Sequence, residues 1–561
     1  MKLKIKGGGT VSLTQKDFLS SGGQGNVYAK GNTAYKVYKD PKKMIPTAKI
    51  DELSVMTDAN IIRPDKVLLD SRNKPVGYTM RYVRDVYSLC QLFPPAFKKR
   101  HKLDEKQILE LVLFFRGLVE HTHSKGILIV DLNEMNYLVS HSFNEIYGID
   151  VDSYQTPGFP ATAIMESIRD RHVKNAQFSA VTDWFSWGIV TFQMWMGIHP
   201  YKGKHPSIKD MDARMLQNIS VFNADVSVPK ICPDVNAIPQ AFRDWFRAVF
   251  EGGQRVPPPL DAQAVIVIHP VVKTVSGTDN FEIVMYSDLK HDIISYHWFD
   301  GQEAFMTTGG LFVHRNLDSK VPTNAHIGAT PVLNHVVAVY LDKGHVVVYD
   351  ATTKNNIPTI LDGEAIMSYD GRFYVKKGLE MFELQFVEIG QTVQCSARVS
   401  GSVMEKASRI FDGVVMQDVV GAWYATLFPR ANHCYQVKID ELKDYQIVAA
   451  KYDNNVLMVV ASKQGVYDKF IFRFDETFTT YDVRIVEDVP MHEPNFVVLP
   501  NGICSHMTTE EKLELFLNRK DKPDTKVVED PVLSGDMRLF HKGTKLMFAR
   551  GSEVYTISMK K

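Results

Sequence analysis

Cysteine is scarce in this sequence, and the cysteines that occur are not spaced for metal or disulfide chemistry. The chain of 561 residues contains five of them, an odd number, with no C-x-x-C pair. Zinc sites and disulfide frameworks need closely spaced or evenly paired thiols, so the sequence supports neither. We expect reduced and mostly buried thiols at Cys90, Cys232, Cys395, Cys434 and Cys504.

Long apolar runs and net charge are also missing. No window approaches the ~18 apolar residues of a membrane helix, and the first six residues, MKLKIK, alternate basic and apolar side chains unlike a signal peptide. Lys and Arg together number 65 and are balanced by 65 Asp and Glu. We therefore expect a cytoplasmic protein that binds neither a membrane nor nucleic acid.

The sequence does contain enough material for more than one domain. Hydrophobic residues make up 45% and charged residues 23%, which is typical of a globular protein. A chain of this length usually forms roughly two to four domains. Residues 1–255 hold 34 Lys and Arg against 26 Asp and Glu, a balance of +8, so the remainder holds 31 against 39, or −8. This difference indicates two domains of unlike composition, and attraction between them is a second interpretation.

A segment rich in glycine and proline marks the predicted domain boundary. Residues 252–259 read GGQRVPPP, in which the glycines end a helix and the three prolines favour an extended, semi-rigid connection. We place a linker at 252–262, between a first domain at 1–255 and a second domain at 263–561.

The first domain is predicted to have two lobes. Residues 1–82 read as short strands and turns with one helix at 47–56. In residues 84–250, apolar positions three and four apart predict a long helix over 104–126, and a second apolar helix is predicted over 182–196. We therefore expect an α+β domain with a strand-rich lobe followed by a helical lobe.

The second domain reads as a series of hairpins. Short β-branched and aromatic runs, such as VAVY at 337–340 and VVVY at 346–349, are separated by Gly, Asn and Asp turns. The hairpins recur about every 40 residues, and propeller blades commonly span ~40–50 residues. We expect an all-β domain that is a six- or seven-bladed β-propeller, with a partner bound on an exposed face. A pair of β-sandwiches is the alternative.

A glycine-rich turn is the first of several motifs that fit transfer of a phosphoryl group from ATP. Residues 20–28, SSGGQGNVY, lie between two apolar strands, where glycines let backbone N–H groups approach phosphate oxygens. An ordinary β-hairpin turn would have the same composition. The residues of this motif that we assign to nucleotide binding are Gly22, Gly23, Gly25 and Val27.

Lys36 is the candidate cation for the phosphates. It lies eleven residues after Gly25 in the alternating strand AYKVY, from which a lysine could reach the α- and β-phosphates if a carboxylate held it. Glu52, on the helix at 47–56, is the candidate carboxylate, and Asp51 is a weaker one. Isolated Lys and Glu residues are usually solvated, so the assignment of Lys36 and Glu52 as a pair depends on the other motifs.

The strongest motif follows the long helix. In ILIVDLNEMNYLV, residues 127–139, Asp131 and Asn136 place two proton- or metal-handling groups on one loop between apolar runs. Polar groups in such surroundings require partners. The segment YGIDVDSYQ follows, in which Asp150 is the candidate carboxylate for Mg²⁺. A polar turn that caps two hairpins is the structural alternative.

With these motifs in this order, residues 15–255 resemble the protein kinase superfamily, and more closely its bacterial and phage-type members. The shared patterns are G-G-x-G-x-V-Y, D-L-N-x-x-N and I-D-x-D-S-[FY]-Q. The resemblance implies an enzyme that uses ATP and Mg²⁺. The roles that it implies are an ion pair of Lys36 with Glu52, Asp131 as catalytic base, Asn136 and Asp150 as metal ligands, Met80 as gatekeeper, and residues 81–83, ending in Val83, as the hinge to adenine.

Four later residues match the same family. The resemblance implies that Glu166 closes the activation segment and pairs with Arg255. It also implies that Asp183, in TDWFSWG, anchors the backbone of the catalytic loop from a buried helix. His199, in GIHPY, is then a structural residue and not a metal ligand.

The sequence departs from the usual kinase pattern at the catalytic loop. Ile129 and Val130 stand where most kinases have His-Arg, so we do not expect control by loop phosphorylation. Asn133 stands where Ser/Thr kinases usually have lysine. Only 16 residues separate Asp150 from Glu166, which is shorter than loops that cradle peptides. We expect the second domain to share in docking the substrate.

The sequence as a whole predicts a protein serine/threonine kinase with an unidentified protein substrate and a β-rich recognition domain. The altered catalytic loop leaves a pseudokinase scaffold as an alternative, and the short activation segment leaves a small-molecule kinase. The second domain offers no grouping of nucleophile and base. The adjacent His433 and Cys434 come nearest to one, and they lack further ligands at metal spacing.

Overall fold

The computed structural model describes residues 1–161, 164–173, 177–260, 280–299, 301–313, 316–390, 392–520 and 525–560. The chain divides into two compact units. The first comprises Met1–Lys273, Ser462–Tyr467 and Asp488–His492, and the second comprises Thr274–Ala461, Asp468–Glu487 and Glu493–Lys561. The chain is therefore multidomain, as the sequence predicted. The predicted linker at 252–262 reaches residues 261 and 262, which lie outside the described residues, so the boundary stays a prediction.

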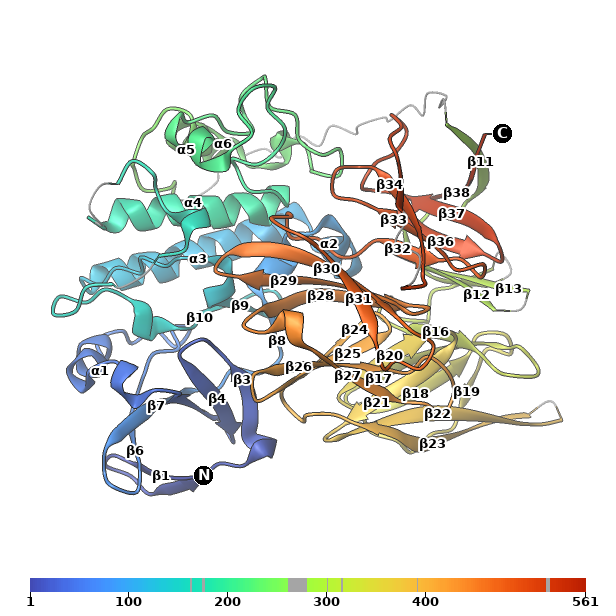
Figure 1. Ribbon diagram of the computed structural model, residues 1–561, viewed down its shortest axis with the longest axis horizontal. Helices are drawn as coiled ribbons and strands as arrows, with labels where there is room; N and C mark the ends of the chain where they lie inside the picture. The colour runs from blue at the N-terminus through green and yellow to red at the C-terminus, as the bar shows by residue number, and fades with distance from the viewer. Residues whose placement is uncertain are drawn as a thin grey trace. The chain divides into compact units, whose positions relative to one another are not determined.

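A seven-stranded antiparallel sheet forms one part of the first unit (Figure 1). Its strands are β1 (Lys2–Ile5), β2 (Thr10–Ser12), β3 (Phe18–Ser21), β4 (Gly25–Lys30), β5 (Thr33–Tyr38), β6 (Val67–Leu69) and β7 (Pro75–Arg81). The order across the sheet is β2-β1-β6-β7-β5-β4-β3. β5 therefore lies inside the sheet, between β4 and β7. Its Tyr and Val residues suit such a position, and Tyr35 packs with Leu3 and Leu68 in a buried cluster.

A small three-stranded sheet frames the loops that carry the predicted site. It is formed by β8 (Val86–Ser88), β9 (Tyr137–Ser140) and β10 (Ile146–Gly148), in the order β10-β9-β8. The loop with Asp131 precedes β9, and Asp150 follows β10 by two residues. Because β9 and β10 pair directly, the two loops leave the same end of one hairpin.

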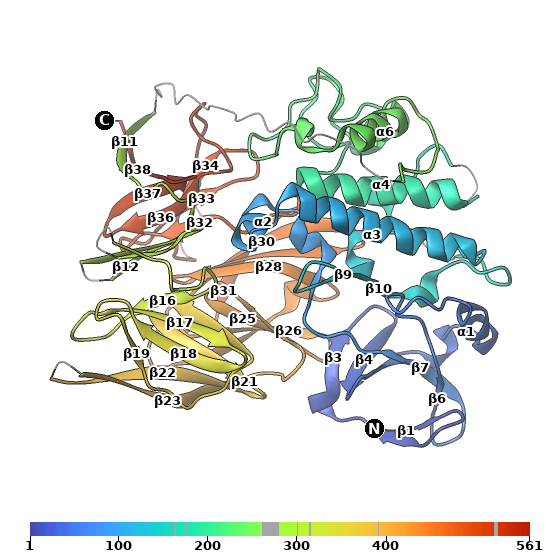
Figure 2. The same ribbon diagram turned by 180° about the vertical axis from the view of Figure 1, so that it is seen from behind.

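The first unit also contains the helices of the chain's first half. They are α1 (Thr47–Leu53), α2 (Pro95–Arg100), α3 (Glu105–Ser124), α4 (Ala180–Met196), α5 (Met211–Leu216) and α6 (Gln240–Phe250). α3 and α4 run side by side (Figures 1 and 2). α3 begins at a capping box, in which the Asp104 carboxylate accepts a hydrogen bond from the Gln107 N–H at 2.8 Å. No helix of the described residues is long and apolar enough to cross a membrane.

The two long helices follow the predicted pattern closely. The apolar residues of α3 that were expected on one face, Ile108 and Phe115 among them, are buried. α4 is buried over most of its length and ends at Gly197, whose φ of +68° is the left-handed conformation that glycine adopts most readily. α1 is shorter than predicted, because it ends at Leu53 instead of residue 56.

The second unit is built from four-stranded sheets, of which the described residues contain seven. Only the end of β29 and the start of β30 belong to the first unit. The pairings whose register is described are antiparallel, for example β17 with β18. The first three sheets are β12 (Ile293–Phe299), β13 (Gln302–Thr307), β14 (Gly310–Val313) and β15 (Asn316–Asp318); β16 (His326–Ala329), β17 (Val336–Asp342), β18 (His345–Asp350) and β19 (Asn355–Ile357); and β20 (Ala365–Tyr369), β21 (Arg372–Lys377), β22 (Glu380–Ile389) and β23 (Thr392–Ser402).

Three further sheets continue the same pattern, and the seventh joins distant parts of the chain. The next are β24 (Ser408–Phe411), β25 (Val414–Val419), β26 (Ala422–Leu427) and β27 (Tyr435–Ile439); β28 (Gln446–Asp453), β29 (Val456–Lys463), β30 (Val466–Phe474) and β31 (Tyr481–Val486); and β32 (Phe496–Val498), β33 (Ile503–Met507), β34 (Leu513–Leu517) and β35 (Thr525–Val528). The seventh contains β36 (Arg538–Lys542), β37 (Lys545–Arg550), β38 (Glu553–Met559) and β11 (Phe281–Asp288).

The seventh sheet joins strands from the two ends of the unit. Among the described residues of the unit, β11 is the first strand and pairs with β38, the last, in the order β11-β38-β37-β36. The first strands of several neighbouring sheets also touch: β12 with β16, β16 with β20, β20 with β24, β24 with β28, β32 with β36, and β12 with β36. The apolar core lies between adjacent sheets. One buried cluster combines Val339 of β17 with Phe373 of β21, and another combines Met416 of β25 with Val459 of β29.

Candidate functional site

The glycine-rich turn joins β3 to β4 at the edge of the seven-stranded sheet. The Gly22 N–H donates to the Gly25 carbonyl oxygen at 2.9 Å, which closes the turn. Gly25 lies so close to β5 that a Cβ atom there would stand 2.8 Å from the Val37 carbonyl oxygen, so this position requires glycine. Val27 lies opposite Lys36 in the register of β4 and β5. The turn and the lysine are therefore placed together by adjacent strands.

Lys36 is bonded to two aspartates. Its Nζ donates to Asp150 Oδ1 at 2.7 Å and to both oxygens of Asp152 at 2.8 and 2.9 Å. Asp150 has a φ of +58° and begins a short 3-10 turn over Val151–Ser153, so the backbone reverses and presents both carboxylates to β5.

The expected ion pair of Lys36 with Glu52 is wrong for this structure. The Glu52 carboxylate instead accepts a hydrogen bond from the Gly158 N–H at 3.0 Å. The physical reason is local: α1 directs a different residue, Lys49, toward the aspartates, and Lys49 Nζ donates to the Asp152 carbonyl oxygen at 2.8 Å. Glu52 therefore holds the segment after Asp150 and leaves the ammonium of Lys36 to the two aspartates.

Charge and burial oppose each other in this cluster. Burial alone would lower the pKa of Lys36, but the negative charges of Asp150 and Asp152 outweigh it and raise that pKa. Burial alone would raise the pKa of Asp152, but the positive charge of Lys36 and hydrogen bonds from Lys36 and Tyr38 lower it to about 2. At neutral pH the lysine is a cation and Asp152 is a carboxylate. Lys36 is therefore a permanent cation next to the glycine-rich turn, held between two aspartates.

Asp131 lies in the loop before β9 and accepts hydrogen bonds from two sides. Its Oδ1 accepts from the Met165 N–H at 2.8 Å, and its Oδ2 accepts from Asn136 Nδ2 at 3.3 Å. Asn136 Nδ2 also donates to the Asp131 carbonyl oxygen at 3.0 Å. Burial raises the pKa of Asp131, and the opposite effect of these hydrogen bonds is smaller. The carboxylate is thus held in place and made more basic than a solvated aspartate.

Asn136 and Asp150 are brought together by the backbone. The Ile149 N–H donates to the Asn136 carbonyl oxygen at 2.9 Å, so the residue before Asp150 is tied to Asn136. A carboxylate and an amide oxygen are ligands that Mg²⁺ accepts. The Asp150 side chain is 47% exposed, which leaves it open to a metal ion. The donor set at this position therefore fits Mg²⁺.

Asp183 fixes the backbone of the Asp131 loop. Its two carboxylate oxygens accept from the Ile129 and Val130 N–H groups, each at 2.8 Å, and from His123 Nε2 at 2.9 Å. Val130 has a φ of +63°, which is strained for a β-branched residue. The buried carboxylate holds this conformation, in agreement with the anchoring role expected for Asp183.

The predicted adenine hinge lies where the sheet ends. Met80 is in β7, opposite Ala34 of β5, and residues 81–83 follow directly. The Tyr82 N–H donates to the Asn32 carbonyl oxygen at 2.9 Å, which ties this segment to the turn between β4 and β5. Val83 is half-buried. Their contact with a nucleotide stays a prediction.

The expected ion pair of Glu166 with Arg255 is also wrong. Arg255 Nη2 donates to Asp170 Oδ1 at 2.8 Å, whereas Glu166 pairs with Arg169 at 2.8 Å. The Asp170 side chain is 3% exposed and that of Glu166 is 64% exposed. A buried carboxylate needs a partner much more than a solvated one does, so Arg255 lies on Asp170.

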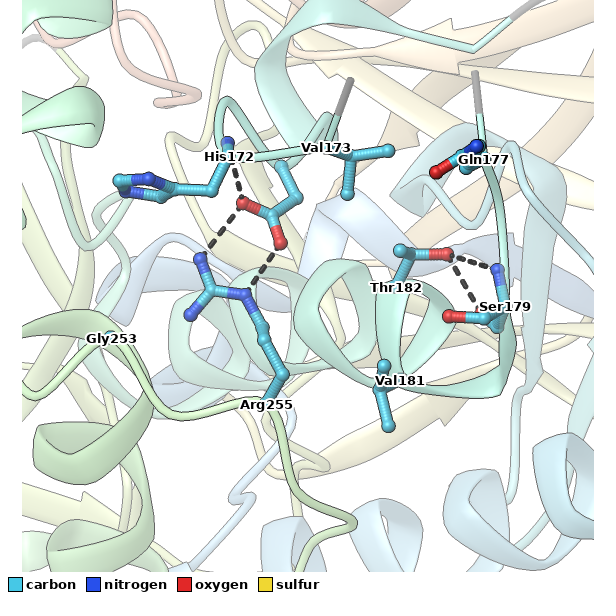
Figure 3. Close-up of a pocket in the computed structure, with 9 residues that line it drawn as sticks. His172, Val173, Gln177, Ser179, Val181, Thr182, Gly253 and Arg255 are labelled. Atoms are coloured by element: carbon cyan, nitrogen blue, oxygen red, sulfur yellow. Dashed lines mark hydrogen bonds and ion pairs between the residues drawn. The ribbon is translucent and has the colours of Figure 1, made fainter. Parts of the chain in front are cut away.

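A pocket of about 380 Å³ lies beside this ion pair in the helical part of the unit (Figure 3). Arg255 and His172 border one side of it, and Ser179 and Thr182, at the start of α4, border the other (Figure 3). The Thr182 hydroxyl donates to the Ser179 carbonyl oxygen at 2.7 Å. None of the residues around Lys36 or Asp131 lines the pocket, so it is separate from the candidate site.

His199 is buried and uses both ring nitrogens in hydrogen bonds. Nε2 donates to the Ser167 carbonyl oxygen at 2.9 Å, and Nδ1 accepts from the Tyr201 N–H at 3.2 Å. Burial lowers the pKa of His199 to about 3, so the ring is neutral at physiological pH. No cluster of three or more potential metal ligands occurs within the described ranges. These contacts agree with the structural role expected for His199.

The buried ring of His199 makes stability depend on pH. Its pKa of about 3 in the folded protein lies below the unfolded value of 6.5, so its contribution is fully present above pH 6.5 and is lost as pH falls toward 3. We expect wild type to lose roughly 3 kcal/mol of unfolding free energy between pH 7 and 4.5 relative to His199→Gln, which does not titrate. Urea unfolding at both pH values measures the difference. Equal losses in the two proteins would contradict this assignment.

Two residues of the site were not assigned a role by sequence reasoning, Asp152 and Tyr38. Asp152 accepts from the Tyr38 hydroxyl at 2.7 Å in addition to Lys36. The available signal was the second aspartate of the D-x-D pattern at 150–152, in a segment that follows a buried strand. Tyr38 shares the sheet face of Lys36, two residues along β5.

Comparisons with known proteins add little to this geometry. No family model matches the sequence, and no curated protein matches it. Among solved structures, the chain is similar to the kinase PK-1 of the Cydia pomonella granulovirus, with 15% identity and a TM-score of 0.33. The likeness covers 43% of this chain and 86% of the viral chain. A likeness of this size does not assign an activity.

Proposed function

We propose that the first unit has a protein-kinase fold and transfers the γ-phosphoryl group of ATP to a protein hydroxyl, of serine or threonine. The observation that carries the proposal is the position of four groups on two adjoining loops and one strand. Lys36 is bonded to Asp150, Asp131 is bonded to Asn136, and the residue before Asp150 is bonded to Asn136. Phosphoryl transfer needs this combination of cation, metal ligands and proton acceptor.

Each group has a distinct task in this proposal. The backbone of the turn at Gly22, Gly23 and Gly25 approaches the phosphates, with Val27, Met80 and Val83 around the base, and Lys36 neutralises phosphate charge. Asp150 and Asn136 would hold Mg²⁺, which offsets the charge that develops on the phosphoryl oxygens. Asp131 accepts the proton of the attacking hydroxyl through its carboxylate. Glu52 has no part in this scheme, because it is bonded to Gly158.

We also propose that the seven sheets of the second unit are the blades of a β-propeller. The four-stranded sheets, the contacts between their first strands and the pairing of β11 with β38 support it. Propellers are built from typically about 4–8 such four-stranded sheets around a central channel. A pair of β-sandwiches would have fewer and larger sheets. Propellers commonly bind partners through exposed loops, so the proposed task of this unit is to recognise a protein substrate or partner.

Nucleotide binding and transfer by the full chain test the kinase proposal. With Mg²⁺ and labelled ATP, wild type should phosphorylate itself or a test protein on Ser or Thr, and MgATP should raise its melting temperature. Asp150→Asn should weaken the effect of Mg²⁺ on nucleotide binding, since it removes a metal ligand. Asp58→Asn, whose carboxylate caps the Asn60 N–H at 2.8 Å and takes no part in the proposed scheme, is the matched control.

Two results would favour the other interpretations. If millimolar MgATP left the melting temperature of wild type unchanged, the first unit would be a scaffold and the kinase proposal would fail. If phosphate appeared on a small metabolite and on no protein, the enzyme would be a small-molecule kinase. The second result would keep the roles of Lys36, Asp131 and Asp150 and change only the acceptor.

A further inference from the structure

Asp152 is a buried carboxylate that the scheme above does not use. Its side chain is 3% exposed, whereas that of Asp150 is 47% exposed. Both oxygens of Asp152 face Lys36 Nζ, and Oδ2 also accepts from the Tyr38 hydroxyl. A carboxylate so enclosed needs a permanent cation nearby. Lys36 is that cation.

The same enclosure argues against Asp152 as a direct metal ligand. A metal ion would have to displace Lys36 and the Tyr38 hydroxyl from a carboxylate that solvent hardly reaches. Asp150 needs no such exchange, since nearly half of its side chain is open. The two aspartates of the D-x-D pattern therefore differ in what they can bind, although their side chains are chemically identical.

The helix carboxylate expected to hold Lys36 is engaged elsewhere. Glu52 accepts from the Gly158 N–H, and a Cβ atom on Gly158 would lie 2.3 Å from Glu52 Oε1, so the carboxylate rests directly on the backbone there. α1 contributes Lys49 to the cluster instead, through the bond from Nζ to the Asp152 carbonyl oxygen. Lys49 thereby fixes the backbone of Asp152 while Asp152 fixes Lys36.

We propose that Asp152 is the positioning residue for Lys36, in place of a glutamate on α1. The proposal rests on the proposed function, in which Lys36 contacts the phosphates of ATP. The proposal follows from the partners of Lys36: its ammonium lies between the carboxylates of Asp150 and Asp152, and Lys49 bonds only the backbone of Asp152. With Mg²⁺ and ATP bound, Asp150 would hold the metal and Asp152 would still hold Lys36. Lys36 would then keep a carboxylate partner while its ammonium contacts the phosphates.

The test compares Asp152→Asn with Glu52→Gln in the full chain. Asp152→Asn removes a charged hydrogen-bond partner of Lys36, so we expect kcat/KM for MgATP to fall about 10- to 100-fold, mainly through KM, with KM for the protein acceptor unchanged. Glu52→Gln keeps the size of the side chain and lies outside the cluster, so kcat/KM should stay within about threefold of wild type. Equal or larger losses for Glu52→Gln would overturn the proposal.

A second readout does not depend on activity. Asp152 joins the short turn after Asp150 to β5 through Lys36, so loss of its charge should loosen that turn. Hydrogen exchange read by mass spectrometry should therefore be faster over residues 150–154 in Asp152→Asn and unchanged there in Glu52→Gln. Unchanged exchange in both variants would overturn the proposal. If exchange follows Asp152 in a protein that transfers no phosphate, the proposed function fails while the bond between Asp152 and Lys36 stands.

A milder variant covers the case in which Asp152→Asn does not fold. Tyr38→Phe removes only the hydroxyl that donates to Asp152 Oδ2 and leaves the charge of the carboxylate in place. We expect KM for MgATP to rise by about two- to tenfold, in line with the loss of one hydrogen bond to a charged group. Tyr35→Phe, in the same strand, is the matched control and should leave KM unchanged. An unchanged KM in Tyr38→Phe, or an equal rise in Tyr35→Phe, would contradict the proposal.

Discussion

Asp131→Asn is expected to lower the rate of phosphoryl transfer about 10²- to 10⁴-fold and to leave the Kd for MgATP nearly unchanged. Asparagine has the size of aspartate and can still accept the hydrogen bond from the Met165 N–H, so the loop should keep its shape. It cannot accept the proton of a hydroxyl. Steady-state kinetics and a nucleotide titration on the same preparation separate the two effects.

The exposed turn between β6 and β7 provides a matched control. Asp70→Asn makes the same chemical change there, where the carboxylate caps the Arg72 and Lys74 N–H groups at 2.8 Å each. It should transfer phosphate at the wild-type rate. If Asp131→Asn were as active as Asp70→Asn, Asp131 would not be the proton acceptor, and the assignment of the whole loop would have to be withdrawn.

Asp183→Asn is expected to lower the unfolding free energy by about 3–5 kcal/mol. Asparagine offers one oxygen where the structure uses two, so either the Ile129 or the Val130 N–H would face an amide N–H₂ group inside the protein. The left-handed conformation of Val130 would then lose part of what holds it. Urea unfolding measures the loss, and hydrogen exchange at Ile129 and Val130 should rise more than elsewhere in the unit.

A neighbouring residue on α4 provides the comparison. Ser186 is also buried, and its hydroxyl donates to the Ile168 carbonyl oxygen at 2.9 Å. Ser186→Ala removes one neutral hydrogen bond, so it should cost only about 1 kcal/mol. If the two variants lost equal stability, the loss would reflect disturbance of α4 and not release of the Asp131 loop.

Local patterns in the sequence predicted the local structure well. The apolar spacing from Ile108 to Val119 specified α3 and its buried face, because a helix of 3.6 residues per turn brings such positions together. The glycine turn, Lys36, the Asp131 loop and Asp150 were grouped through their resemblance to protein kinase motifs, and the structure does bring Lys36 to Asp150. The helix prediction depended on neighbours in sequence, whereas this grouping depended on the resemblance.

The choice between similar partners could not be predicted in the same way. Glu52, Asp150 and Asp152 are all carboxylates that could meet Lys36, and the outcome depends on the reversal of the backbone at Asp150, whose φ is positive. Arg255 likewise meets Asp170 instead of Glu166, four residues away, because of burial. Spacing alone does not tell which carboxylate is enclosed. Such contacts are set by the packing of segments that are distant in sequence.

The pairing of β11 with β38 has a consequence for the order in which the chain can fold during synthesis. Thr556 of β38 donates a hydrogen bond to the Val284 carbonyl oxygen across 272 residues. At translation rates of roughly 5–20 residues per second, β11 waits about 15–50 s for its partner after it leaves the ribosome. Its sequence, FEIVMYSD, is mostly apolar, so during that time it presents an unpaired edge on which other chains can add strands. Among the described strands of this unit, β11 is thus made first and paired last. In a stalled or truncated chain that lacks β38, the edge of β11 would stay unpaired.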